Sequence, residues 1–114
     1  MALIARALAQ QARFILMDEP ASSLDYGNQM RLLREIRNLA KEGAGVCFTA
    51  HYPDHAFLTQ SSVLALEQKD RWKKGSAQEV ITEELLKSMY KLDAKIRSYK
   101  DGDRVMRQVT ARID

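Results

Sequence analysis

The sequence predicts an α/β fold with parallel strands flanked by helices and a small antiparallel hairpin at the C-terminal end. Residues 14–17 (FILM) form a continuous apolar run, which is typical of a strand covered on both faces. An amphipathic pattern follows as far as about Lys41, and residues 44–50 form a second run of small and β-compatible residues. Strand, helix and strand in this order indicate a parallel unit with a right-handed crossover.

The helices of the first half have recognisable composition and ends. Residues 1–10 are predicted to be helical because Ala and Leu, which are strong helix formers, dominate them. Asp25 or Asn28 can cap the helix that runs to about residue 41, and Gly43 and Gly45 are expected to end it. Its expected apolar stripe consists of Met30, Leu33, Ile36 and Leu39, joined by Leu32 and Ala40.

The second half is predicted to contain shorter elements. They are a helix over 53–58, a strand over 62–66, a strand entered at 71–73, a helix capped at residue 76, a helix over 82–91, and strands over 94–99 and 105–111. Ser76 and Glu79 match a capping box, and Thr82 can cap the next helix. Asp101-Gly102 is a turn signal between the last two strands.

Length and charge limit the classes of protein. A chain of 114 residues suffices for one compact domain, and its net charge of +3 is small. Its basic residues are interspersed with acidic ones, which argues against nucleic-acid binding, and Arg71, Lys73 and Lys74 are interpreted as a solvated strand edge. The single Cys47 excludes an internal disulfide and is expected to be a small buried hydrophobe. No apolar stretch reaches the roughly 20 residues of a membrane span, so a cytosolic protein is expected.

The most informative feature is the acidic pair Asp18-Glu19 at the end of the first apolar run. Two adjacent carboxylates at the tip of a buried strand are costly unless a positive charge meets them. The carboxyl ends of parallel strands are also where α/β proteins bind ligands, and a metal-bound phosphate would supply the missing charge. Adjacent residues on a strand point to opposite sides, so the two acids can take different tasks. The alternative is a strand that ends in two solvated acids.

Four segments, in order along the chain, resemble segments of the ABC-type ATPases. They are residues 4–9 (IARALA, the helix after the family's signature sequence), 14–20 (FILMDEP, Walker B), 21–25 (ASSLD, D-loop) and 49–51 (TAH, the place of the switch histidine). Within the family, residues 24–29, 51–58, 78–82 and 90–94 look most like importers of iron chelates, haem or cobalamin. The resemblance implies a C-terminal portion of an ABC ATPase domain, itself a P-loop NTPase, over residues 1–95, with residues 96–114 as an extension and hairpin.

This resemblance implies ATP and Mg²⁺ as cofactors and assigns roles to five residues. Asp18 would meet Mg²⁺ through a water, and Glu19 would polarise the water that attacks the γ-phosphate. His51 would contact that phosphate and sense its loss, although a histidine satisfied by a neighbouring carbonyl is the alternative. Asp25, with Ser23 in the same loop, would communicate with the nucleotide across a dimer, whereas the residues alone make Asp25 a plain helix N-cap.

The family's nucleotide-binding sequences do not all occur here. Among the 114 residues there is no G-x-x-x-x-G-K-[ST] loop (Walker A), no Q-loop and no LSGGQ-like signature. The resemblance therefore implies a fragment, from a shortened or split gene, that is expected to hydrolyse ATP negligibly by itself. His55, one helical turn beyond the switch histidine, is interpreted as a surface residue.

The implied partners are a second ATPase subunit, transmembrane permease subunits and, indirectly, a periplasmic or lipoprotein substrate-binding protein, but no nucleic acid. The implied location is the cytoplasmic face of the cell membrane. Two other classes stay open: an ATPase of the DNA-repair or chromosome-organising type, and a non-catalytic remnant that folds poorly alone. A helicase with a D-E-x-x box is a further rival, in which Leu24-Asp25 and His51 would be coincidences. The sequence does not identify the transported compound.

Overall fold

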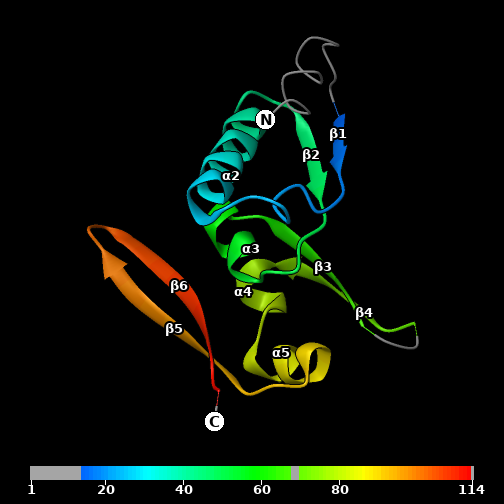
Figure 1. Cartoon of the computed structure of the whole chain (residues 1–114), viewed down its shortest axis with the longest axis vertical. Helices are drawn as coiled ribbons and strands as arrows, with labels where there is room; N and C mark the ends of the chain where they lie inside the picture. Colours follow the sequence, from blue (N-terminus) through cyan, green and yellow to red (C-terminus); the bar gives the residue numbers. More distant parts are fainter. Residues whose placement is uncertain (1–13, 68–69, 114) are drawn as a thin grey trace. The chain divides into compact units, whose positions relative to one another are not determined.

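The computed structural model describes residues 14–67 and 70–113, in two compact units, Met1–His51 and Tyr52–Asp114 (Figure 1). The first unit contains β1 (Phe14–Met17), α2 (Tyr26–Lys41) and β2 (Gly45–Phe48). The second contains α3 (Asp54–Thr59), β3 (Ser62–Leu66), β4 (Trp72–Ser76), α4 (Ala77–Val80), α5 (Glu83–Tyr90), β5 (Ala94–Asp101) and β6 (Arg104–Ala111). The predicted helix over residues 1–10 lies outside the described residues.

The predicted strand–helix–strand unit is confirmed. β1 and β2 pair in parallel, with Phe14 opposite Gly45 and Met17 opposite Phe48, and α2 is the crossover between them. β2 is shorter than the predicted strand over 44–50. The fold class expected from the sequence therefore holds in this unit.

The expectation that β1 is covered on both faces is wrong for the described structure. Ile15 and Met17 are buried, whereas the side chains between them alternate outward, and Phe14 and Leu16 remain 63% and 73% exposed. Cys47, expected to be buried, is also exposed. The register explains this error, because Cys47 is paired with Leu16 and neighbouring strands place paired residues on the same face of a sheet.

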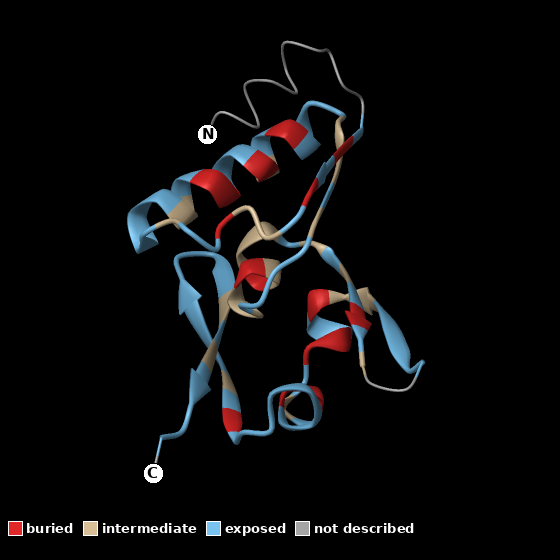
Figure 2. Ribbon diagram, turned by 45° about the vertical axis from the view of Figure 1, so that its right-hand side comes forward, coloured by how far each residue is buried: buried red, intermediate tan, exposed pale blue. Residues whose placement is uncertain are grey.

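Both ends of α2 follow from its sequence. Asp25, rather than Asn28, is the N-cap, and its Oδ1 accepts a hydrogen bond from the Asn28 N–H at 2.8 Å. At the other end Gly43 adopts φ +100°, which lets the N–H of Ala44 reach the Leu39 carbonyl at 3.0 Å. Buried residues recur along the helix (Figure 2); they are Leu32, Leu33, Ile36 and Leu39, whereas Met30 is only half-buried and Ala40 is exposed.

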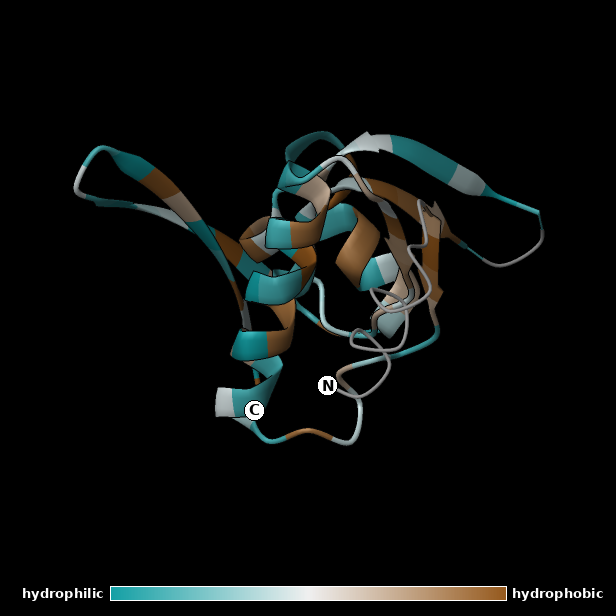
Figure 3. Cartoon of the chain, turned by 90° about the horizontal axis from the view of Figure 1, so that it is seen from above, coloured by the Kyte–Doolittle hydropathy of each residue, from teal (hydrophilic) through white to brown (hydrophobic). Residues whose placement is uncertain are grey.

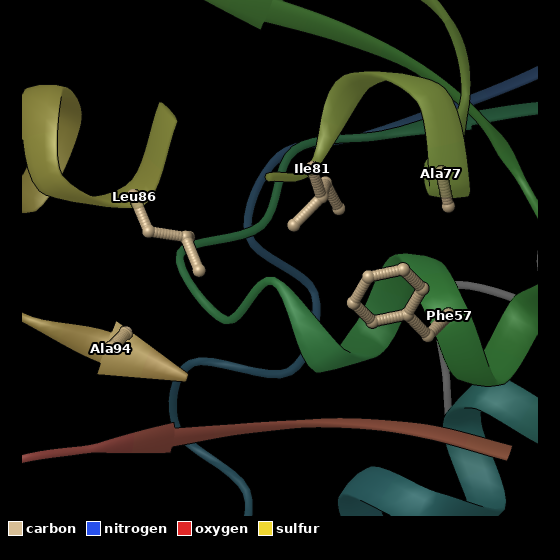
Figure 4. Close-up of a cluster of buried hydrophobic side chains, with 5 residues drawn as sticks. All are labelled: Phe57, Ala77, Ile81, Leu86 and Ala94. Atoms are coloured by element: carbon tan, nitrogen blue, oxygen red, sulfur yellow. The ribbon is translucent and has the colours of Figure 1, made fainter. Parts of the chain in front are cut away.

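In the second unit, β3 pairs antiparallel with β4 and does not extend the parallel pair. The core of this unit is a cluster of buried side chains from three helices and the start of β5, shown in Figure 4: Phe57, Ala77, Ile81, Leu86 and Ala94. A smaller cluster consists of Ala65, Val80 and Leu85. The lysines of the predicted strand edge, Lys73 and Lys74, lie on β4 and are exposed.

The predicted caps and hairpin are confirmed. Ser76 and Glu79 form the capping box of α4, and Thr82 caps α5. β5 and β6 pair along their whole length, and the hairpin carries both hydrophobic and hydrophilic residues (Figure 3). The base of the hairpin is anchored by the Asp54 carboxylate, which accepts the Val109 N–H at 2.8 Å. The predicted division of the chain between residues 95 and 96 stays a prediction.

Candidate functional site

The carboxyl ends of β1 and β2 bring the predicted site residues together. Beyond the last strand pair, the Thr49 N–H donates to the Met17 carbonyl at 3.1 Å, so the parallel ladder continues one step past β2. Asp18 and Glu19 follow Met17 directly, and His51 follows Thr49 by two residues. The first unit therefore places the two acids opposite the histidine, as the ends of neighbouring parallel strands must.

A single hydroxyl group joins the Asp18 carboxylate to the backbone of Glu19. Thr49 Oγ1 donates to Asp18 Oδ1 at 2.7 Å and accepts the Glu19 N–H at 2.7 Å. These two hydrogen bonds join residues about thirty positions apart in the sequence, and no separate role was predicted for Thr49. The signal that could have revealed it is a hydroxyl residue just beyond the second strand, at the level of acids just beyond the first.

Glu19 is directed toward His51. Its backbone lies in the left-handed region with φ +46°, which is uncommon for a residue with a side chain. Its carbonyl accepts the Ser22 N–H at 3.2 Å, and its Oε1 contacts His51 Nε2. The side chains of Glu19 and His51 are 41% and 69% exposed, so both are accessible to water and to a ligand. A polar contact this exposed contributes little to stability.

The loop after Glu19 is held to the first turn of α2. Gln29 Nε2 donates to the carbonyls of Ala21 at 3.2 Å and Leu24 at 3.1 Å, a clip that sequence reasoning missed. Ser23 is exposed in this loop, and the carboxylate of Asp25 ends it by capping the helix. The structure therefore brings Asp18, Glu19 and His51 together. Ser23 and Asp25 lie in the loop that follows Glu19.

His55, interpreted above as a surface residue, is buried, with 4% of its surface exposed. The ring lies 5.2 Å from the ring of Tyr52, centroid to centroid, and belongs to the second unit. Burial lowers the pKa of His55, and the neighbouring Asp54 carboxylate opposes that shift. The earlier interpretation failed because α3 is only six residues long, too short for its sequence to show which side faces the core.

A magnesium ion fits the oxygen donors at this site only as a partly hydrated ion. Within residues 14–67 and 70–113, no three His, Cys, Asp or Glu side chains are gathered in a way that could hold a metal. Mg²⁺ does not require such a cage, because it usually retains waters and takes one or two carboxylates together with phosphate oxygens. Asp18, with a carboxylate oriented by the Thr49 hydroxyl, provides one suitable oxygen group.

Comparison with known proteins reveals close relatives. No protein-family model matches the chain. An uncharacterised ABC transporter ATP-binding protein of Haemophilus influenzae is 37% identical over 94 residues, which cover 82% of this chain and 36% of that protein. The iron(3+)-hydroxamate import ATP-binding protein of Bacillus subtilis is 36% identical over 94 residues, covering 82% and 35% respectively. Other relatives are named as import ATP-binding proteins for molybdate, hemin and vitamin B12.

A solved structure agrees with these relatives. A chain of a transporter described as being of the metal-chelate type, in an inward-facing conformation, matches 96% of this chain and 44% of its own length, with a TM-score of 0.87 and 29% identity. The architecture is thus that of the P-loop NTPases, with acids at the carboxyl edge of parallel strands. The chain belongs to the ABC transporter ATP-binding proteins, and it spans about a third of the length of the curated relatives it matches.

Proposed function

We propose that this chain provides the hydrolytic half-site of an ATP-hydrolysing subunit of an ABC importer. The observation that carries the proposal is the array at the ends of β1 and β2, in which Thr49 joins Asp18 to Glu19 and Glu19 contacts His51. Phosphoryl transfer requires of the protein mainly positioning and charge stabilisation, and this array supplies fixed carboxylates and an imidazole at one edge of a sheet. The sequence relationship to import ATP-binding proteins supports it.

Each of the three side chains has a proposed task. Asp18 accepts hydrogen bonds from the water shell of Mg²⁺, and the ion when bound neutralises charge on the phosphates. Glu19 orients and polarises the attacking water through the carboxylate oxygen that is not engaged with His51. His51 donates a hydrogen bond to the γ-phosphate through the ring nitrogen that is not engaged with Glu19, and its contact with Glu19 orients the ring.

The remaining assignments concern contacts with other chains. We propose that Ser23 and Asp25 face the nucleotide and a second ATPase subunit across a dimer, because both lie in the exposed loop that Gln29 clips to α2. Transmembrane permease subunits are the proposed membrane partners, with a substrate-binding protein acting through them, which implies a location at the cytoplasmic face. No helix of residues 14–67 and 70–113 combines the length and the apolar character that crossing a membrane requires.

The proposed cargo is an iron-siderophore, haem or cobalamin. Relatives named for iron(3+)-hydroxamate, hemin and vitamin B12 support this class. A relative named for molybdate is similar to this chain to the same degree, so sequence identity at this level does not by itself select the cargo. Radiolabelled iron-hydroxamate, haem and cobalamin uptake by cells that carry the complete transporter would identify the compound. Uptake of molybdate alone would contradict the proposed class.

No G-x-x-x-x-G-K-[ST] loop occurs among these 114 residues, so the chain alone is proposed to hydrolyse ATP negligibly. The decisive experiment uses a longer polypeptide that contains this chain and a P-loop. Glu19→Gln keeps the size of the side chain and removes its charge, and a loss of about 10²- to 10⁴-fold in kcat is expected if Glu19 acts as a general base. His51→Ala should also reduce kcat strongly.

The matched control is Glu35→Gln, the same change at an exposed position of α2. Its turnover should equal that of the unaltered protein. Normal Mg²⁺-dependent turnover after both Glu19 and His51 have been neutralised would refute the proposed function. Rapid hydrolysis by the purified 114-residue chain, abolished by Glu19→Gln, would refute only its inactivity in isolation.

A further inference from the structure

One side chain at the site has no task in the reaction proposed above. Thr49 Oγ1 lies 2.7 Å from both Asp18 Oδ1 and the Glu19 nitrogen. We propose that Thr49 is a positioning residue whose hydroxyl sets the direction of both carboxylates. The inference rests on the proposed function, since it concerns how the acids of that same site are held.

The hydroxyl group can serve both acids at once. A threonine hydroxyl has one donor hydrogen and two acceptor lone pairs. The hydrogen goes to Asp18 Oδ1, which fixes the plane of that carboxylate and leaves Oδ2 for other partners. A lone pair accepts the Glu19 N–H, which fixes the peptide plane between the two acids. Because both bonds end on one oxygen, the Asp18 carboxylate and the Glu19 backbone are held by the same group.

Glu19 needs such an anchor. Its φ of +46° is disfavoured for a residue with a Cβ atom, and such a conformation persists only where neighbouring contacts hold it. One side of the residue is held by Thr49 through the N–H, and the other by Ser22, whose N–H donates to the Glu19 carbonyl at 3.2 Å. This backbone direction carries the carboxylate to His51. Without the hydroxyl, the peptide would be free to relax and Glu19 would leave that position.

Thr49 is itself well placed to hold the acids. Its own N–H is bonded to the Met17 carbonyl at 3.1 Å, which ties it to the end of β1. Its branched Cβ restricts χ1, so the hydroxyl has few alternative directions. The residue is exposed, and water competes for its hydrogen bonds, so they contribute little to the overall stability of the chain. A role in positioning and a role in stability therefore predict different measurements.

The first arm of the test measures amide hydrogen exchange at Glu19 by NMR in the purified chain. Thr49→Val removes the hydroxyl and keeps the shape, whereas Thr49→Ser keeps the hydroxyl. The Glu19 amide should exchange about tenfold faster in T49V, the factor expected from the loss of one hydrogen bond, and near the original rate in T49S. The thermal midpoint should not change. The control is Thr110→Val, the same change at an exposed position of β6.

The second arm measures turnover in the longer polypeptide with a P-loop. T49V should lower kcat roughly 10- to 100-fold, as expected when a catalytic group is displaced by about 1 Å, with the KM for ATP unchanged. T49S should restore most of the loss, and T110V should have no effect. An unchanged Glu19 exchange rate in T49V, or full turnover in T49V while E19Q is inactive, would overturn the inference and leave the proposed function standing. Full turnover in both E19Q and T49V would overturn the proposed function as well.

Discussion

Asp25 offers a direct way to separate the folding of this site from its chemistry. In the structure its carboxylate caps α2 through a 2.8 Å bond to the Asn28 N–H, and no other acidic residue lies in the first turn of the helix. Replacing Asp25 with Ala removes the cap and, with it, the one acidic side chain at the N-cap or in the first turn of α2. Asp25→Asn removes the charge but can still accept the hydrogen bond.

The expected magnitude follows from these two contacts. Loss of an N-cap costs about 1 kcal/mol, and loss of an exposed charge at a helix N-terminus costs about 0.5 kcal/mol at low salt. D25A should therefore lower the free energy of opening of α2 by about 1.5 kcal/mol and D25N by about 0.5 kcal/mol. The charge component should shrink further at high salt, because exposed charges are screened.

Hydrogen exchange at the buried positions of α2 measures this opening without interference from the second unit. Exchange at Leu33, Ile36 and Leu39 should be more than tenfold faster in D25A and only about twofold faster in D25N. Glu35→Ala, which removes an acid elsewhere on the same helix, is the control. Equal exchange in D25A and the unaltered chain would refute the capping argument. In the longer polypeptide, low turnover in D25N despite an intact α2 would assign Asp25 a further task at the dimer.

Three further predictions concern other contacts. Leu86→Ala should destabilise the second unit by about 2–5 kcal/mol, because Leu86 is 2% exposed within the core cluster, and urea unfolding followed by Trp72 fluorescence measures this. Gln29→Leu should make the amides of residues 21–25 exchange several-fold faster, because two loop carbonyls lose a donor worth about 1 kcal/mol each. Burial lowers the folded-state pKa of His55 below its unfolded value of 6.5, so the neutral ring contributes stability that is complete above pH 6.5 and is lost as the pH falls from 6.5 through the folded-state pKa. Urea midpoints between pH 7.5 and 5.5 should show this decline, and His55→Phe should remove it.

Each of these predictions has a result that contradicts it. A fully tolerated Leu86→Ala would mean that the cluster is not the core of the second unit. Unchanged exchange over residues 21–25 in Gln29→Leu would show that the loop is held by other contacts. The histidine argument fails if stability rises as the pH is lowered from 7.5 to 5.5, or if the phenylalanine variant retains the same slope.

The elements of this chain could be predicted because their ends are encoded locally. Asp25, Ser76 and Thr82 each cap the helix that begins at the next residue by accepting the N–H three residues further on, and such a cap is visible without any knowledge of distant contacts. The acids at the end of β1 could be recognised in the same way, because an apolar run that stops at two carboxylates is a local pattern.

What escaped prediction depends on contacts between distant parts of the sequence. A short apolar run does not tell whether one face or both are covered, and so Leu16 and Cys47 were expected to be buried. The burial of His55 likewise follows from tertiary packing. The bond from Thr49 to Asp18 joins residues just beyond the ends of different strands, so neither residue type nor local spacing revealed it.

The parallel arrangement of β1 and β2 also has a consequence for the order of folding. A parallel pair cannot form as a hairpin, because its connection must travel back along the sheet, here through α2. Closing such a long connection is entropically costly, so the two strands should meet late, after the helix has formed. The acids on one strand end and the histidine beyond the other then become neighbours only in the finished unit. A nascent or half-folded chain therefore lacks the complete arrangement of Asp18, Glu19 and His51.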